Sequence, residues 1–305
     1  MVSKEELGFD IEEYKDLYPF ESKYMDINGL SYHYFDEGEG DPILMVHGNP
    51  TWSFYYRNLA IAFKDTNRVI AVDHIGCGLS SKPQDYSYTL ENHISNLEKL
   101  IIKLDLKNIT LVVHDWGGAI GIGAALRHLD CFKRFVILNT YAYRVPKTKV
   151  GAFPAGIAFG RVPIFGKIAI RALNGFARGA AKMCALTGEM SDREKKALMA
   201  PYNSYKNRIA TFQFVKDIPV EESHESYKTL LQIEEGLPRL KEKAMQVIWG
   251  KKDFCFDDHF LSEWKRFFPE IPVYEIAEAG HYVIEDSRKK VIEKVRSFLC
   301  ANPIL

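Results

Sequence analysis

Three residues of this sequence have the types and the order needed for nucleophilic catalysis: Asp115, Asp253 and His281. Asp115 stands between an apolar run, residues 111–113, and a stretch of small and apolar residues, 117–126. This pattern predicts a buried strand, a sharp turn and a closely packed helix, with Asp115 at the apex of the turn. Small residues allow such a helix to approach the strand, and the first N–H groups of the helix point toward an anion. The geometry is that of a nucleophile elbow with a carboxylate in place of serine; the alternative is an Asp that only caps the helix.

A carboxylate nucleophile suits displacement at a saturated carbon, because it is already anionic at neutral pH and needs no base to activate it. Asp253 and His281 follow Asp115 at the ends of later predicted strands. The chain order of nucleophile, acid and histidine is that of the α/β-hydrolase fold. We expect Asp253 to hold His281 in one tautomer and to stabilise its protonated form, which leaves the other ring nitrogen free to handle a proton.

The group displaced by Asp115 needs hydrogen-bond donors in a dry pocket as its negative charge grows. Asn49 lies between a Gly and a Pro directly after the apolar run 42–46, and Trp116 directly follows Asp115. Their side-chain amide and indole N–H groups are neutral donors, which can stabilise an anion and still release it. An Asn in this position could instead form an Asx turn.

Buried strands and helices alternate along most of the chain, and this alternation predicts an α/β protein with a mostly parallel, doubly wound sheet. An Asn-Gly pair within residues 25–34 predicts an antiparallel hairpin that opens the sheet. The expected central and later strands are residues 42–46, 68–72, 111–113, 134–139, 244–250 and 272–276. The expected helices of this layer are residues 52–63, 90–104, 119–126 and 288–299.

The alternation stops between about residues 144 and 230, where the sequence predicts a helical cap inserted before the last strands. The predicted division is therefore a first part of the hydrolase core at 1–143, the cap at 144–230 and a second part of the core at 231–305. A lid that contacts an apolar substrate is expected from four aromatic residues of the cap, and ordinary packing within the cap is the alternative. They are Phe153, Phe159, Phe165 and Phe176.

The composition limits the classes of partner. The 40 basic and 40 acidic residues cancel, so no strong overall field is expected to attract nucleic acid or an anionic membrane. Charges and prolines interrupt the apolar residues 150–170, which argues against a transmembrane span. The first residues lack the apolar core of a secretory signal, so we expect a cytoplasmic protein. Five scattered cysteines predict buried core residues without a disulfide or a metal site: Cys77, Cys131, Cys184, Cys255 and Cys300.

Four motifs resemble those of the haloalkane dehalogenase family of α/β-hydrolases: residues 47–50, 73–78, 114–118 and 280–281. The resemblance extends over nearly the whole chain. In that family the elbow Asp attacks the halogen-bearing carbon, an Asn and a Trp hold the halide, and a His with an acid partner directs water onto the ester. Some members carry the acid after the preceding strand, but here that strand ends in Asn139. The resemblance therefore implies these roles for Asp115, Asn49, Trp116, His281 and Asp253.

A narrower resemblance involves residues 49–57, 200–204, 207–211 and 253–260, which look like the β-lactone decarboxylases of bacterial long-chain olefin biosynthesis. Those enzymes share the dehalogenase fold and its five site residues. They convert cis-3-alkyl-4-alkyl-oxetan-2-ones to cis-alkenes and carbon dioxide. The resemblance implies the same reaction on a hydrophobic small molecule, without a cofactor or a metal. It also raises the hypothesis of assembly with upstream enzymes of that pathway, such as the β-lactone synthetase.

Other functions fit parts of the pattern. A haloalkane dehalogenase would use the same five residues to hydrolyse a haloalkane to an alcohol and halide. Epoxide hydrolases also carry an elbow Asp, but they resemble this chain less at Asn49 and need cap tyrosines, for which Tyr202 and Tyr205 are the candidates. A non-catalytic hydrolase-fold binding protein would be expected to have lost one of the five residues, and none is lost. The sequence leaves open the alkyl chain length, the atom attacked first and the oligomeric state.

Overall fold

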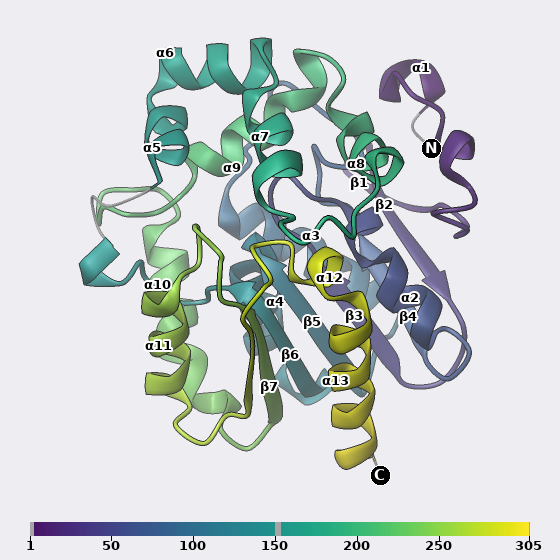
Figure 1. Cartoon of the computed structure of the whole chain (residues 1–305), viewed down its shortest axis with the longest axis vertical. Coiled ribbons are helices and arrows are strands. Elements are labelled where there is room, and N and C mark those ends of the chain that lie inside the picture. The colour runs from purple at the N-terminus through teal and green to yellow at the C-terminus, as the bar shows by residue number, and fades with distance from the viewer. Residues whose placement is uncertain (1–2, 150–153, 305) are drawn as a thin grey trace.

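The computed structural model describes residues 3–149 and 154–304. Within these residues eight strands form one sheet in the order β1-β2-β4-β3-β5-β6-β7-β8 (Figure 1). The strands are β1 (Lys23–Ile27), β2 (Leu30–Glu37), β3 (Pro42–Val46), β4 (Arg68–Val72), β5 (Ile109–Asp115), β6 (Phe132–Thr140), β7 (Ala244–Gly250) and β8 (Val273–Ile276).

The pairing of the strands confirms a mostly parallel sheet. β1 and β2 form the predicted hairpin, in which Asn28 and Gly29 adopt φ angles of 54° and 83°. β2 also pairs antiparallel with β4, and the other neighbouring pairs are parallel. Successive residues of β5 face different hydrophobic clusters, Leu111 one and Val112 the other. Because both faces of the strand are covered, its sequence is apolar without alternation.

Helices cover both faces of the sheet. The cluster on one face includes α2 (Arg57–Phe63), α12 (Val283–Asp286) and α13 (Arg288–Ala301). The cluster on the other face includes α3 (Leu90–Lys103), α4 (Trp116–Arg127), α10 (Tyr227–Gly236) and α11 (Asp258–Phe267). The helix expected at residues 52–63 begins as a 3₁₀ helix, Ser53–Tyr56, before α2 continues it.

A layer of helices between β6 and β7 lies beyond the carboxyl ends of the parallel strands, at the top of Figure 1. Its elements are α5 (Ala155–Arg161), α6 (Pro163–Gly166), the π-helix η5 (Lys167–Ala172), α7 (Gly175–Met183), α8 (Asp192–Met199) and α9 (Ile209–Lys216). These elements lie within the segment predicted as a cap. The last residues of that segment, 227–230, instead belong to α10, where Ile233 and Gly236 approach α4.

The cysteines are free, and not all of them are core residues. Cys77 and Cys184 are buried, whereas Cys300 is exposed in the last turns of α13. The prediction of a buried residue was therefore wrong at Cys300, because this side chain lies on the solvent side of an amphipathic helix. Among the helices of the described residues, none is both long and apolar enough to cross a membrane.

Candidate active site

Asp115 lies at the apex of the predicted strand, turn and helix. It is the last residue of β5 and has a φ of 53° and a ψ of −128°. Such a backbone costs a non-glycine residue about 1–3 kcal/mol and persists where its surroundings fix it. The hydroxyl of Thr140 donates to the Asp115 carbonyl. The helix begins so close to β3 that a Cβ atom on Gly117 would lie 1.9 Å from the carbonyl oxygen of Val46.

The Asp115 carboxylate is buried, with 8% of the residue exposed. Its Oδ1 accepts the backbone N–H of Asn49 at 2.5 Å. Burial raises the pKa of Asp115, and the charge of His281 and the backbone N–H groups of Asn49 and Trp116 offset this only in part. The site therefore holds a poorly hydrated carboxylate between two backbone donors and an imidazole.

His281 lies between two carboxylates. Its Nδ1 is 2.8 Å from Oδ2 of Asp253, and its Nε2 is 3.7 Å from Oδ2 of Asp115. Asp253 is held in turn because its Oδ1 accepts the backbone N–H groups of Cys255 and Phe256 at 2.7 and 3.1 Å. Burial lowers the pKa of His281, but the charge and hydrogen bond of Asp253 and the charge of Asp115 outweigh it, so the pKa is raised. The protonated ring is thus favoured between the two acids.

Asn49 and Trp116 both line the cavity above Asp115. The Asn49 side-chain Nδ2 donates to the backbone carbonyl of Thr211 on α9 at 3.1 Å, so one of its two hydrogens is already used. Its second hydrogen is the one left for a ligand. The Trp116 indole N–H has no hydrogen-bond partner among the described residues, and its ring packs edge-on against Tyr141. The structure therefore places both predicted donors at the floor of one pocket, although Thr211 was not anticipated.

The pocket is a cavity of about 450 Å³ between the sheet and the helices above it. Apart from Asn49, Asp115, Trp116 and His281, its lining is mainly apolar and includes Ile157, Phe159, Ile170, Phe176, Met183, Val215, Phe256 and Phe260. Two of the expected lid aromatics, Phe159 and Phe176, therefore contact the cavity. Phe165 stacks on Phe159 with ring centroids 5.1 Å apart but does not line the cavity, and Phe153 lies outside the described residues.

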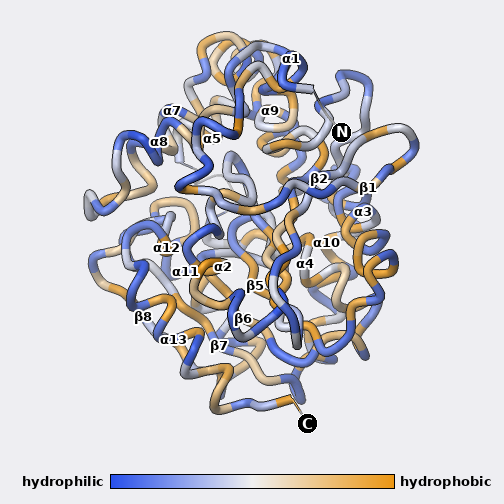
Figure 2. Tube along the Cα trace, turned by 90° about the vertical axis from the view of Figure 1, so that its right-hand side faces the viewer, coloured by the Kyte–Doolittle hydropathy of each residue, from blue (hydrophilic) through white to orange (hydrophobic). Residues whose placement is uncertain are grey.

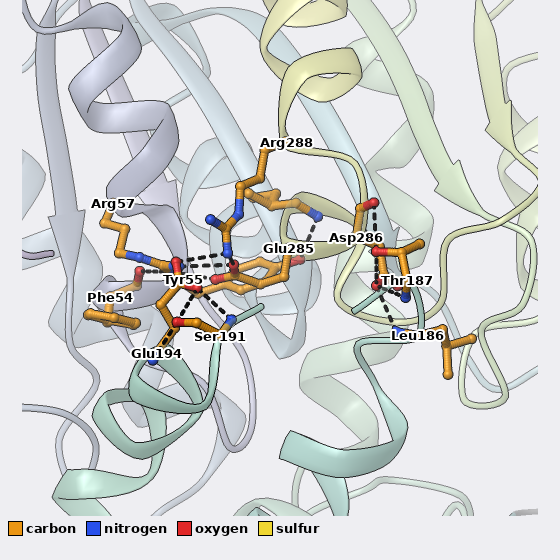
Figure 3. Close-up of polar contacts among 11 residues, drawn as sticks. Phe54, Tyr55, Arg57, Leu186, Thr187, Ser191, Glu194, Glu285, Asp286 and Arg288 are labelled. Atoms are coloured by element: carbon orange, nitrogen blue, oxygen red, sulfur yellow. Dashed lines mark hydrogen bonds and ion pairs between the residues drawn. The ribbon is translucent and has the colours of Figure 1, made fainter. Parts of the chain in front are cut away.

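A buried polar network ties the helical layer to the segment that carries His281 (Figure 3). Arg57 of α2 forms ion pairs with Glu194 of α8 and with Glu285, which follows His281 by four residues. Arg288 contacts the same two carboxylates at 2.8 and 2.7 Å. Burial would raise the pKa of Glu194, but hydrogen bonds from Arg288, the Ser191 backbone and Arg57 lower it to about 2.

Asp286 makes a second connection in the same region. Its Oδ1 accepts the backbone N–H groups of Leu186 and Thr187 at 2.6 and 2.9 Å (Figure 3). Its Oδ2 accepts the N–H of Gly280 at 2.7 Å. The N–H of Tyr282 donates to the carbonyl of Cys184. Asp286 and the Cys184 carbonyl thus connect the residues on both sides of His281 to residues 184–187, which lie above the sheet. No sequence pattern indicated this role for Asp286.

Two buried histidines and the two cap tyrosines lie outside the cavity. His74 and His114 are buried, their ring nitrogens contact the backbone carbonyls of His47 and His281, and burial lowers both pKa values. Tyr202 is buried and donates to the carbonyl of Thr51 at 3.0 Å. Tyr205 stands beside Arg171 at the surface. Neither tyrosine lines the cavity, so neither cap candidate for the epoxide-hydrolase alternative faces Asp115. The tyrosine that does line the cavity, Tyr141, directly follows β6 and is not part of the cap. The described residues contain no cluster of His, Cys, Asp or Glu suited to a metal ion.

Comparison with known proteins identifies the family of this fold and site. Residues 41–287 match the protein family described as alpha/beta hydrolase fold. A cis-3-alkyl-4-alkyloxetan-2-one decarboxylase of Shewanella oneidensis is 45% identical, covering 95% of this chain and 91% of the relative. A protein of the same name from Xanthomonas campestris is 38% identical over 94% of this chain and 98% of its own.

Haloalkane dehalogenases are similar at lower identity. Haloalkane dehalogenase 2 of Mycobacterium tuberculosis is 29% identical over 93% of this chain and 97% of its own. The crystal structure of a loop variant of a Bradyrhizobium elkanii haloalkane dehalogenase superposes with a TM-score of 0.83 at 22% identity, covering 92% of this chain and 97% of that one. At this identity the superposition shows a shared fold.

Proposed function

The chain belongs to the alpha/beta-hydrolase fold family, and from this premise we propose that it decarboxylates cis-3-alkyl-4-alkyloxetan-2-ones to cis-alkenes in long-chain olefin biosynthesis. The observation that carries the proposal is the similarity to two decarboxylases of that name over almost the whole chain. The five residues Asp115, Asp253, His281, Asn49 and Trp116 are the proposed site. An apolar cavity above a single reactive carboxylate suits a lactone with two alkyl chains.

The first step is an attack by the Asp115 carboxylate on the ring carbon that bears the ring oxygen. The new bond joins an Asp115 oxygen to this carbon, and the ring carbon–oxygen bond breaks with inversion. The released group is a carboxylate that stays attached to the neighbouring carbon. The Trp116 indole N–H and the second amide hydrogen of Asn49 are the donors placed to stabilise it.

In the second step the carbon–carbon bond to this carboxylate breaks and carbon dioxide leaves. The electron pair forms the double bond, and the bond from carbon to Asp115 breaks in the anti direction. The Asp115 carboxylate is regenerated, so no water is consumed. Inversion followed by anti elimination converts a cis lactone to a cis alkene. Protonated His281, 3.7 Å from Asp115, would stabilise the departing carboxylate.

Oxygen-18 water separates this route from hydrolysis of an ester at Asp115. During turnover of the lactone we expect the Asp115 carboxylate to remain unlabelled in the peptide mass spectrum. Label that accumulates in Asp115 would show that water attacks a covalent ester, and this would contradict the proposed route. Initial attack at the lactone carbonyl is the alternative first step.

The proposed reaction is tested with two substrates in parallel. The purified protein is incubated with a cis-3,4-dialkyl-β-lactone and, separately, with a 1-bromoalkane. Alkene is measured by gas chromatography, and the concentration of released bromide is measured in parallel. We expect alkene without bromide, and no alkene from the Asp115→Ala variant. Bromide release with an unreacted lactone would contradict the decarboxylase proposal and favour a haloalkane dehalogenase, which the Mycobacterium tuberculosis relative makes the second candidate.

We also propose a cytoplasmic location and delivery of the lactone by the enzyme that forms it. The support is chemical, because a dialkyl lactone is poorly soluble and the cavity that would receive it is apolar. Affinity purification from the native host tests this assembly, and recovery of the protein without a lactone-forming enzyme would contradict it.

A further inference from the structure

The helices above the sheet expose a concentration of apolar side chains on one short stretch. Of the large hydrophobic residues exposed in the described part of the chain, seven fall between residues 159 and 183. We call them the apolar cap face: Phe159, Val162, Ile164, Phe165, Ile168, Leu173 and Met183. Ile164 is 70% exposed and Leu173 is 63% exposed. The elements that carry the face, α5, α6, η5 and α7, lie together at the upper end of the molecule (Figure 1). The chain at that end includes several stretches of hydrophobic residues (Figure 2).

The charges on the same stretch have one sign. Residues 154–188 contain no Asp or Glu, although acidic and basic residues balance over the whole chain. Lys167, Arg178 and Lys182 are exposed and form no ion pair with any residue in the described ranges. The one uncharged polar residue between 154 and 183, Asn174, is buried. The exposed side chains of this face are therefore apolar or cationic.

Two side chains belong to both the cavity lining and this face. Phe159 and Met183 line the cavity above Asp115, and they are also 48% and 52% exposed. The same two side chains thus contact both the interior of the cavity and the outside. A molecule lying against the apolar cap face could enter the cavity without first crossing water.

From these three observations we infer that the apolar cap face docks on the surface of an anionic phospholipid bilayer. An apolar face whose own stretch of chain carries only cationic charges has the composition of segments that lie in the interface of such bilayers. A protein partner would be expected to meet a rim with varied polar groups, which this face lacks. The net charge of the whole chain is zero and predicts no attraction to an anionic membrane. The charges of residues 154–188 are all positive, however, and can attract such a membrane locally. Docking itself does not depend on the proposed reaction.

Vesicle sedimentation tests the inference with the full chain and three double variants. The vesicles contain phosphatidylcholine alone or phosphatidylcholine with phosphatidylglycerol. One variant, Ile164→Ser with Leu173→Ser, removes apolar contacts, and another, Lys167→Gln with Lys182→Gln, removes charge; none of these residues lines the cavity. The matched control is Ile102→Ser with Lys103→Gln, an exposed apolar and basic pair on α3.

We expect binding to the anionic vesicles alone, weakened by added salt because screening reduces surface attraction. The charge variant should bind roughly tenfold more weakly, the apolar variant should also bind more weakly, and the α3 control should match the wild type. The inactive Asp115→Ala variant should bind normally, so failure of docking and failure of the proposed reaction are distinguished. Equal binding by all variants, or no binding to anionic vesicles, would overturn the inference. So would self-association of the protein that is lost in the apolar variant, because the face would then contact a second copy.

Discussion

At the scale of single residues, the conformation and charge that the proposed chemistry requires of Asp115 lower the stability of the folded protein. Asp115 combines a strained backbone with a carboxylate that burial makes harder to ionise. The protein offsets this cost with the Asn49 and Trp116 backbone N–H groups and with His281. The pKa of Asp115 nevertheless stays raised, so the ionised site is less stable than a neutral one would be.

We therefore expect Asp115→Asn to be more stable than the wild type at pH 8, with an unfolding free energy that is roughly 1 kcal/mol larger and a higher unfolding temperature. The folded pKa of Asp115 lies above the unfolded one, so its cost is absent at low pH and grows as pH rises through the folded pKa. The stability difference should accordingly shrink toward pH 4. Thermal unfolding followed by circular dichroism between pH 4 and 8 measures it. A variant less stable than the wild type at pH 8 would show that the charge contributes net stability.

His281 gives a second prediction at this scale. Asp253→Asn should lower the pKa of His281, because the main groups that raise it are the charge and hydrogen bond of Asp253. In the wild type this pair contributes stability fully below pH 6.5, and the contribution is lost as pH rises through the raised pKa. Nitrogen-15 NMR titration of the imidazole measures the pKa directly. Asp257→Asn, a change on the same loop beside His259, is the control and should leave His281 unchanged.

At the scale of elements, the strands and helices could be predicted from repeating hydrophobic patterns in the sequence. The contacts between residues far apart in the chain could not. The apolar runs identify the strands because both faces of the sheet are covered, and parallel strands bring Asp115, Asp253 and His281 to one edge. The bond from Asn49 to Thr211 joins residues 162 positions apart, and no local pattern specifies which cap residue meets that loop. The same holds for Asp286. The predicted end of the cap, residue 230, falls within α10, and the division into core and cap stays a prediction.

The close approach of α4 to β3 predicts that alanine substitution at two helical glycines changes the unfolding free energy by different amounts. Gly117→Ala should lower the unfolding free energy by about 1–3 kcal/mol or more, since the added Cβ would overlap the carbonyl oxygen of Val46. Gly156→Ala is the control, because nothing lies within 4 Å of a Cβ at that site. In α5 the change should be neutral or stabilising by about 0.5–1 kcal/mol. Chemical denaturation measures both values. Equal effects of the two substitutions would contradict the close approach of α4 to β3.

At the scale of the whole molecule, the helices above the sheet divide into a held part, which is fastened to the segment around His281, and a part that presents apolar side chains to the outside. The held part includes α8 and the stretch before it, which the Arg57 network and Asp286 fasten to the segment around His281. The other part, α5 to η5, presents apolar side chains to the outside. One side of the cavity wall is thereby fixed to the loop that carries His281, while Phe159 of the other part lines the cavity and is 48% exposed.

This division predicts that Arg57 controls the attachment of the held part. Arg57→Met removes one of the two guanidinium groups that contact the buried carboxylates of Glu194 and Glu285, and it should cost about 3–5 kcal/mol. Arg193 lies next to Glu194 on α8 and forms an ion pair with Asp16. The side chains of Arg193 and Asp16 are 51% and 58% exposed. Arg193→Met should therefore cost at most about 1 kcal/mol.

Calorimetry and limited proteolysis check this prediction together. In Arg57→Met we expect cleavage between residues 184 and 200 before the core unfolds, whereas the wild type and Arg193→Met should resist it. Because Glu194 has a folded pKa of about 2, the wild-type attachment should also weaken as pH falls from 4.5 toward 2. Equal and small losses in the two variants would mean that the buried network does not hold the cap. The His281 loop would then depend on Asp286 and the Cys184 carbonyl for its attachment.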